Sequence, residues 1–535
     1  MKTKSFLLCL LALLFFPLLV ISCLKSPSYD LIIRGAWVLD GTGNPWFRAD
    51  VGVRGRRIAA LGDLGREKTR RFLEARGFVV CPGFIDLHTH CDQDLLEMPG
   101  ADNYLSQGVT TVIGGNCGDH PLPLRDLFRR LSEKGIGPNF GSLAGHNTIR
   151  EKVMGFAGRP PTGEEMGRMK RLVEEEMRAG ALGLSTGLSY LPGIYADTDE
   201  LVELASVAAR FGGIYASHIR DQGRKIREAI EEAIRIGERA GLPVQISHIK
   251  LADEAVWNKL ELVSEPVEEA RARGVEVSLD LYPYTATSSG FTSSFPAWVF
   301  EGGTQKFLER LKDPSLYSRV RDHIIQRRLT SARGLNPLRS IFIAQSGKFP
   351  RYEGLNLEAI LKERGWPLTA ESAADLIIDL EKSGGASGIF FQMDESDVEA
   401  FLRMPWVMIG SDGGVQKMGR GRPHPRSYGT FPRLIARYVR EKNIIPLSEA
   451  VRKMTSYPAQ VLRLSDRGLI REGLAADLVI FDPQTFADTA TFEAPHSFSR
   501  GLAAVVVNGQ IVWENGRPTG RRPGVILTHV HKSQG

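Results

Sequence analysis

The chain has 535 residues, of which 42% are hydrophobic and 24% charged, a composition typical of globular proteins. This length favours one large domain with a smaller one, because a single hydrophobic core rarely grows so large. The formal net charge is +6, but the sequence has no long basic block and no basic stripe with interleaved aromatic residues, which argues against nucleic acid as a partner.

Residues 1–22 have the features of a lipoprotein signal peptide. Lys2 and Lys4 precede an apolar run that is interrupted by Pro17 and ends in VISC at Cys23. This ending resembles a bacterial lipobox, in which Cys23 would receive lipid and become the first mature residue. The alternative is an uncleaved membrane anchor, for which the run is rather short of the roughly 20 apolar residues that span a bilayer. Both interpretations predict an extracytoplasmic protein, on the periplasmic or cell-surface side, that is tethered to a membrane.

Apart from Cys9 in the leader and Cys23, the predicted lipidation site, three cysteines remain: Cys81, Cys91 and Cys117. The first two bracket a predicted strand, and extended backbone would hold them roughly 30 Å apart. A disulfide requires Cα atoms within about 7 Å, so this pair is excluded if the strand is real. Cys117 therefore needs another explanation.

Short β segments occupy both ends of the mature chain. They are separated by turn residues such as DGTGNP in the first half and by glycine-rich turns in the second. We predict one small composite β-sandwich domain built from residues 23–81 and 461–520. The remaining residues, 521–535, form a tail with an H-x-H spacing that no neighbouring motif supports, and we expect it to be disordered.

The middle of the chain, residues 82–460, alternates apolar strand-like runs with amphipathic helical stretches. Such alternation predicts a parallel sheet, and eight strands over this length fit an α/β fold, the (β/α)8 TIM-like barrel. The gap before the eighth strand is long, and residues 286–350 within it look like an insertion. The predicted strands lie at 84–90, 110–116, 139–146, 182–188, 213–220, 244–250, 277–284 and 406–413.

Side chains that can bind a metal or carry a proton gather at the ends of the predicted strands, where such barrels place their chemistry. A lone histidine on an apolar strand is more often a packed core residue than a ligand. Here such side chains end several predicted strands at once, which favours a metal site, because Zn2+ binds imidazole nitrogen, thiolate sulfur and carboxylate oxygen. His88 and His90 also share a face, since strand side chains alternate. The full set is His88, His90, Cys117, His218, His248 and Asp412.

Several motifs resemble those of the N-acyl-D-amino-acid deacylases, or D-aminoacylases, of the amidohydrolase superfamily. They are PGFIDLHTHCD, GGNCG, SHIR, SHIK, YPY and GSDG…HPRSYGTFPR, and the similarity covers nearly the whole mature chain. Many superfamily members bridge two metals with a carboxylated lysine on strand four, but residues 182–188 contain no lysine. The resemblance instead implies one tight zinc ion and a second metal that is weaker or optional. The tight site would use Cys117, His218 and His248, and the second site His88 and His90.

The resemblance also implies catalytic and substrate-binding roles. Asp412 would be the base that takes a proton from water and returns it to the leaving amine, with a strand-end cap as the alternative. Arg426 would bind the α-carboxylate of the substrate through its fork of donors. Further candidates for substrate contacts are Lys250, Tyr282, Ser289 and Tyr190. For Lys250 and Tyr282 the alternative is a barrel-rim position that faces solvent.

The chain departs from the family pattern after GNCG, where Asp119 and His120 replace an aromatic or aliphatic residue and a serine. Because that loop lies beside the predicted metal, the departure puts the acyl-group preference in doubt.

The implied function is zinc-dependent hydrolysis of N-acyl-D-amino acids, which releases a carboxylate and a D-amino acid. The handedness of the substrate is implied by the resemblance alone. Two alternatives stay open: a dipeptidase that releases a C-terminal D-amino acid, and a non-catalytic surface lipoprotein that binds a metal or ligand. The expected partners are a small-molecule substrate and, through the lipid anchor, a membrane, with no prediction of oligomeric state.

Overall fold

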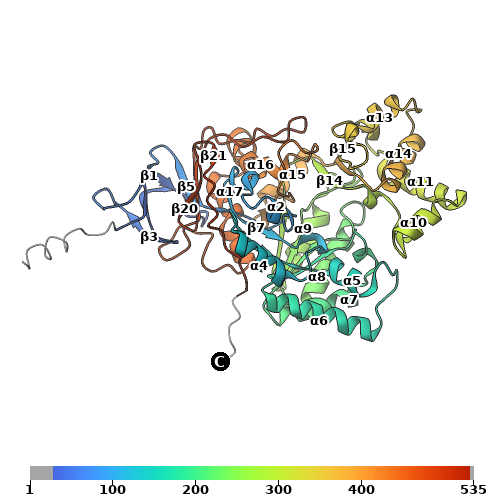
Figure 1. Cartoon of the computed structure of the whole chain (residues 1–535), viewed down its shortest axis with the longest axis horizontal. Coiled ribbons are helices and arrows are strands. Elements are labelled where there is room, and N and C mark those ends of the chain that lie inside the picture. Colours follow the sequence, from blue (N-terminus) through green and yellow to red (C-terminus); the bar gives the residue numbers. More distant parts are fainter. Residues whose placement is uncertain (1–27, 530–535) are drawn as a thin grey trace, which may run out of the picture.

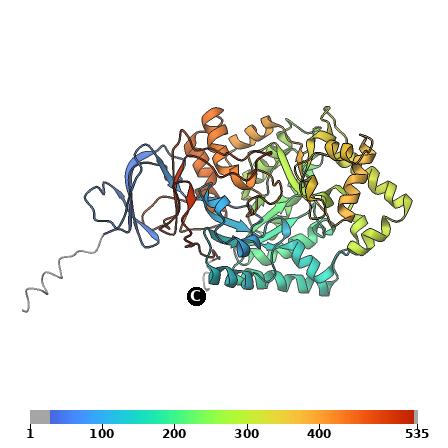
Figure 2. The same ribbon diagram turned by 45° about the horizontal axis from the view of Figure 1, so that its top comes forward.

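The structure is a computed structural model that describes residues 28–529. The predicted signal peptide, Cys23 and residues 530–535 lie outside the described residues. Within the described range, no helix has the length and apolar character needed to cross a membrane. Figures 1 and 2 show three regions side by side: a β domain at one end, a barrel in the middle and a mostly helical insertion at the other end.

A parallel barrel forms the middle region and confirms the predicted fold class. Its two hydrogen-bonded sheets have the orders β6-β7-β8 and β9-β10-β11-β12-β13-β17. Beyond the ends of β6 and β17, Thr89 pairs with Gly413 in a parallel bridge that closes the circle. The strands are β6 (Phe84–Asp86), β7 (Val109–Gly114), β8 (Asn139–Ser142), β9 (Ala144–Gly145), β10 (Gly183–Gly187), β11 (Ile214–His218), β12 (Val244–Ile246), β13 (Val277–Leu281) and β17 (Val407–Ile409).

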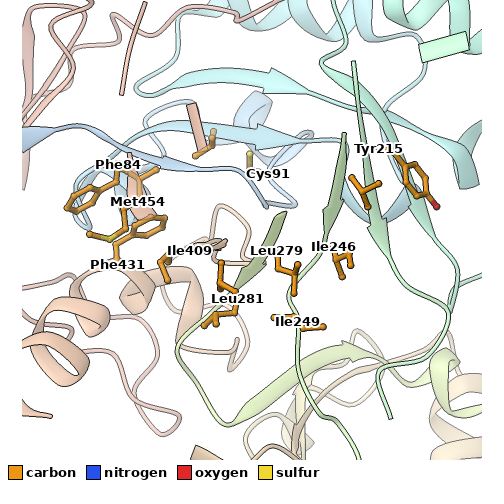
Figure 3. Close-up of a cluster of buried hydrophobic side chains, with 14 of the residues drawn as sticks. Phe84, Cys91, Tyr215, Ile246, Ile249, Leu279, Leu281, Ile409, Phe431 and Met454 are labelled. Atoms are coloured by element: carbon orange, nitrogen blue, oxygen red, sulfur yellow. The ribbon is translucent and has the colours of Figure 1, made fainter. Parts of the chain in front are cut away.

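Amphipathic helices cover the outside of the barrel. In α8 (Ile226–Ala240), isoleucines and alanines repeat every three or four residues and are buried against the strands. α6 (Gly163–Ala179) begins with a capping box, because Thr162 and Glu165 each accept a hydrogen bond from the other's backbone N–H. Other covering helices are α4 (Leu124–Lys134), α5 (His146–Met154), α7 (Thr198–Ala209), α9 (Glu261–Ala272), α15 (Glu395–Arg403), α16 (Arg426–Arg433) and α17 (Leu447–Met454). Figure 3 shows part of the apolar core that these elements share.

The two ends of the chain form one nine-stranded sheet, in the order β21-β20-β19-β18-β5-β1-β2-β3 with β4 also paired to β1. The join between the two halves is antiparallel pairing of β5 with β18. The strands are β1 (Leu31–Val38), β2 (Phe47–Arg54), β3 (Arg57–Gly62), β4 (Phe72–Glu74), β5 (Val79–Pro82), β18 (Leu478–Phe481), β19 (Leu502–Val507), β20 (Gln510–Glu514) and β21 (Arg517–Pro518).

The insertion before the last barrel strand is longer than the predicted range 286–350. Its sheet has the order β14-β16-β15, so the middle strand, β16, comes last in the chain. The unit is complete only at Phe391, and it has a hydrophobic core of its own. Its elements are β14 (Ala286–Gly290), α10 (Thr304–Arg310), α11 (Pro314–Arg328), α12 (Pro337–Ser340), β15 (Ile341–Gln345), α13 (Leu357–Glu363), α14 (Ala370–Lys382) and β16 (Ser387–Phe391).

The tail corrects the expectation of disorder as far as His529, the last described residue. Phe140 N donates to Val525 O at 2.9 Å, and Leu527 N donates to Phe140 O at 2.7 Å. The tail thereby takes the edge of β8 that the next barrel strand leaves unpaired, since β10 pairs with β9. Backbone pairing of this kind is a tertiary contact, and its one local signal is the short apolar run at residues 525–527.

A buried carboxylate joins the β domain to the barrel. Asp477, which precedes β18, is 5% exposed and forms an ion pair with Arg467 Nη1. It also accepts hydrogen bonds from Asn508 N at 2.7 Å and from Asn139 Nδ2 at 2.9 Å. All four residues are buried, so this network replaces the water that each polar group loses on folding.

Removing this carboxylate by Asp477→Ala is expected to lower the free energy of unfolding by about 3–5 kcal/mol, because it leaves Arg467 buried without its buried partner. Asp466→Ala is the matched control, since Asp466 pairs with the same guanidinium but is 47% exposed, and its expected loss is below about 1 kcal/mol. Chemical denaturation followed by circular dichroism measures both. Similar losses for the two variants would contradict the interpretation.

Candidate metal centre

The Cys117 thiol lies among three imidazoles at the C-terminal mouth of the barrel. Its Sγ is 3.4 Å from His88 Nε2, 3.7 Å from His218 Nδ1 and 3.5 Å from His248 Nε2. In a tetrahedral zinc site, bonds of about 2.3 Å to sulfur and about 2.05 Å to nitrogen separate the two ligand atoms by about 3.6 Å. The sulfur and the three nitrogens therefore have the separations of atoms that share a metal.

Asp412 adds a carboxylate on another side of this cluster. Its Oδ1 is 3.6 Å from His88 Nε2 and 3.0 Å from His90 Nε2. Ligand atoms of His88, Cys117, His248 and Asp412 all lie within 4.8 Å of one another. The His90 side chain is 41% exposed. The structure thus brings together all six side chains that the sequence analysis selected, and the mixture of sulfur, nitrogen and oxygen donors fits zinc.

Three of these residues have left-handed backbone, with φ of 54° at Cys117, 36° at His248 and 51° at Asp412. This conformation costs a non-glycine residue of the order of 1–3 kcal/mol, and such residues cluster at functional sites. The loop that carries Cys117 also packs directly on β10, where a Cβ at Gly187 would lie 2.1 Å from Cys117 O. Close packing against glycine therefore holds the thiol in a backbone conformation that it would not adopt by itself.

Two of the imidazoles have protein partners at the ring nitrogen that faces away from Cys117. His88 Nδ1 lies 3.4 Å from Asp280 Oδ2, and His218 Nε2 lies 2.7 Å from Ser189 Oγ. Such partners fix the ring orientation and leave the other nitrogen free to bind a metal. Sequence reasoning missed both residues. Asp280 had one signal, a single acid within the apolar run 277–284, whereas Ser189 had none.

Lys250 faces the third imidazole. Its Nζ lies 3.0 Å from His248 Nδ1 and 3.0 Å from Gln222 Oε1. Burial lowers the pKa of Lys250 to about 7, and its neutral form can accept a hydrogen bond from the Nδ1–H that His248 retains when Nε2 binds a metal. Lys250 was predicted to contact the substrate, and in this structure it holds His248. Gln222, which also lies 3.0 Å from His248 Nδ1, was not predicted from the sequence.

Arg426 lies against the predicted base. Its Nη1 is 2.7 Å from Asp412 Oδ2, and its Nη2 donates to Ser288 O at 3.4 Å. His424 positions this arginine, because its Nδ1 accepts a hydrogen bond from Arg426 N at 3.0 Å and its Nε2 lies 3.0 Å from Ala286 O. Burial would raise the pKa of Asp412, but the nearby charges, that of Arg426 above all, hold it well below its usual range. Asp412 is therefore ionised at neutral pH.

A cavity of about 660 Å³ opens beside the cluster, with His218, His248 and Asp412 in its wall. Lys250, Tyr282, Ser289 and Tyr190, all predicted as substrate contacts, also line it. The hydroxyl of Tyr282 is buried and has no hydrogen-bond partner among residues 28–529, so a donor is available to a ligand. The Tyr190 ring packs 4.4 Å from the His218 ring, and Ser289 Oγ lies 3.3 Å from Ser293 Oγ.

The unusual residues after GNCG do not line this cavity. The His120 imidazole is buried, and its Nδ1 accepts a hydrogen bond from Gly145 N at 2.8 Å. Asp119 is exposed, and its carboxylate lies close enough to His90 and Cys117 to interact with both electrostatically. His120 thus supports β9, whereas Asp119 adds a carboxylate beside the metal cluster.

The amidohydrolase family model matches residues 71–313 and 366–513, which contain every residue of the cluster. This chain is an amidohydrolase. A D-aminoacylase of Alcaligenes xylosoxydans xylosoxydans is 37% identical and spans 94% of this chain and 99% of its own length. The N-acyl-D-glutamate deacylase of the same organism is 36% identical over 93% and 96%. The amidohydrolase also matches a crystal structure of N-acyl-D-glutamate deacylase from Bordetella bronchiseptica, complexed with zinc and a phosphonate inhibitor, with a TM-score of 0.81, 35% identity and coverage of 94% and 99%.

Replacing the thiol by Cys117→Ala is expected to remove most of the bound zinc, because it deletes the atom that three imidazoles surround. Cys91→Ala is the matched control, since Cys91 is equally buried but its Sγ contacts Thr89 Oγ1 at 3.0 Å instead of the cluster. Elemental analysis of the purified amidohydrolase measures zinc per chain. Equal zinc content in the Cys117 variant and the control would refute the assignment of this centre.

Proposed function

We propose that this protein is a zinc-dependent deacylase that hydrolyses N-acyl-D-amino acids to a carboxylate and a D-amino acid. One observation carries the proposal: the Cys117 thiol lies 3.7 Å from His218 Nδ1 and 3.5 Å from His248 Nε2, while strand four offers no lysine. The family membership and the relatives named for this activity, which match nearly the whole chain, support it.

The tight zinc ion would be held by Cys117, His218 and His248, and a second, weaker metal by His88 and His90. A bound zinc ion polarises an amide carbonyl and lowers the pKa of water, so that hydroxide is available at neutral pH. The partners at the outer ring nitrogens keep the imidazoles in the orientation that this binding needs.

Asp412 carries the proton between water and the leaving amine. Its carboxylate is ionised beside Arg426, so it can accept a proton from the attacking water and pass it to the amine nitrogen as the amide bond breaks. Arg426 would bind the α-carboxylate of the substrate with the donors that Asp412 leaves unused. The unpartnered hydroxyl of Tyr282 is placed to donate to a substrate oxygen.

The decisive experiment compares N-acetyl-D-amino acids, N-acetyl-L-amino acids and L,D-dipeptides as substrates of the wild-type protein. We expect turnover of the N-acetyl-D series only. Asp412→Asn should retain zinc but lower kcat by about 10²- to 10⁴-fold, because it removes general base catalysis. Turnover restricted to L-substrates would refute the proposal, and turnover restricted to L,D-dipeptides would make the protein a dipeptidase that releases a C-terminal D-residue. The absence of turnover in every series would favour a binding lipoprotein.

We also propose that the protein is an extracytoplasmic lipoprotein, anchored to a membrane by lipid on Cys23. Lys2, Lys4, the apolar run and the lipobox-like VISC support this location. It would place the enzyme where small D-amino-acid derivatives from outside the cytoplasm are accessible.

The full-length chain, expressed in a bacterium with lipoprotein processing, should incorporate labelled palmitate and sediment with membranes. Cys23→Ser should abolish the label, because the thiol that receives the lipid is gone. A wild-type protein that sediments with membranes without any label would instead identify an uncleaved anchor.

A further inference from the structure

An arginine of the insertion faces the cavity of the metal centre. Arg328 ends α11, and its side chain lines the same cavity as His218 and Asp412. All of its hydrogen bonds go to neutral oxygens: Nε donates to Ser294 Oγ at 3.3 Å, Nη1 to Gln392 Oε1 at 3.1 Å and Nη2 to Ser293 Oγ at 3.1 Å. The guanidinium also lies over the ring of Phe390, 4.7 Å from its centroid.

The charge of Arg328 has no acidic partner. Within residues 28–529, no carboxylate oxygen lies within 4.0 Å of its guanidinium nitrogens, whereas Arg220 and Arg224, which line the same cavity, pair with Glu232 and Asp253 at 2.9 Å. Burial lowers the pKa of Arg328 to about 9, which reflects the cost of holding this charge away from water. An arginine that is partly buried and unpaired within a binding cavity is suited to receive an anion from the ligand.

Its position is fixed relative to the metal centre. The segment after α11 is attached to the barrel loop that follows β12, where Ser331 Oγ donates to Glu254 Oε2 at 2.7 Å and Arg333 lies 5.6 Å from the ring centroid of Trp257. Glu254 is thereby occupied and does not neutralise Arg328. Each terminal nitrogen of Arg328 donates one hydrogen bond to the protein, so each retains an N–H for a ligand.

We propose that Arg328 binds a second anionic group of the substrate, so that the preferred substrates carry a carboxylate in addition to the α-carboxylate that Arg426 binds. This inference rests on the proposed deacylase function and specifies its substrate class. The second carboxylate can come from an acidic D-amino-acid side chain or from a dicarboxylic acyl group. The residues of the metal centre would serve either kind of substrate. Arg328 lies outside the residues that the family model matches, since that match omits residues 314–365.

The test compares kcat/KM for substrates that differ only in this charge. N-acetyl-D-glutamate against N-acetyl-D-glutamine probes the side chain, and N-succinyl-D-leucine against N-butyryl-D-leucine probes the acyl group. We expect the wild-type enzyme to prefer one of the charged substrates over its neutral counterpart by about tenfold or more, the effect of one charged hydrogen bond. The preferred pair identifies the source of the second carboxylate.

Arg328→Met removes the charge but keeps an apolar stem against Phe390. It should abolish the preference, mainly by raising KM for the charged substrate, while kcat/KM for the neutral counterpart stays within about threefold. Arg328→Lys should retain part of the preference. Arg319→Met is the matched control, since Arg319 lies on the same helix but is exposed, over the Trp298 ring, and it should leave the preference unchanged.

A wild-type enzyme that hydrolyses neutral N-acyl-D-amino acids without preferring a charged substrate would overturn this inference and leave the proposed function standing. Equal losses of the Arg328→Met variant on charged and neutral substrates would also overturn it, because a structural role has that effect. Turnover of no N-acyl-D-amino acid by the wild type would remove the proposed function and this inference together.

Discussion

The site depends on the approach of one sulfur atom to three imidazole nitrogens from different barrel strands. Separations of 3.4–3.7 Å between Cys117 Sγ and these nitrogens are achieved with strained backbone at Cys117, His248 and Asp412. The surrounding barrel bears this cost, because its packed strands and glycine contacts leave the loops no room to relax. A rigid parallel barrel is therefore a condition for the chemistry as well as its scaffold.

Much of the fold could be predicted from the sequence, because buried parallel strands have short apolar sequences and their carboxyl ends meet on one face of the barrel. For the same reason, six dispersed side chains could be expected to converge. The left-handed backbone at Cys117, His248 and Asp412 could not be predicted, since it results from tertiary packing. Ser189 and Gln222 likewise have no local pattern, because each acts through contact with a histidine that is 29 or 26 positions away.

The insertion shows another limit of sequence reasoning. The predicted end at residue 350 is too early, because the middle strand of its sheet, β16, comes last in the chain and ends at Phe391. The barrel and the insertion contribute different residues to the cavity. The barrel places Cys117, the histidines and Asp412 at its strand ends, whereas the insertion adds Arg328 to the wall of the same cavity.

The pairing of β5 with β18 has a consequence for biogenesis. Strand β5 emerges from the ribosome nearly 400 residues before β18, one of its two neighbours in the sheet, and the edge of β8 likewise waits nearly 390 residues for residues 525–527. Until these later segments emerge, the edges of β5 and β8 remain open to pairing with other chains. The large sheet and the edge of β8 can therefore be completed only after most of the chain has been synthesised.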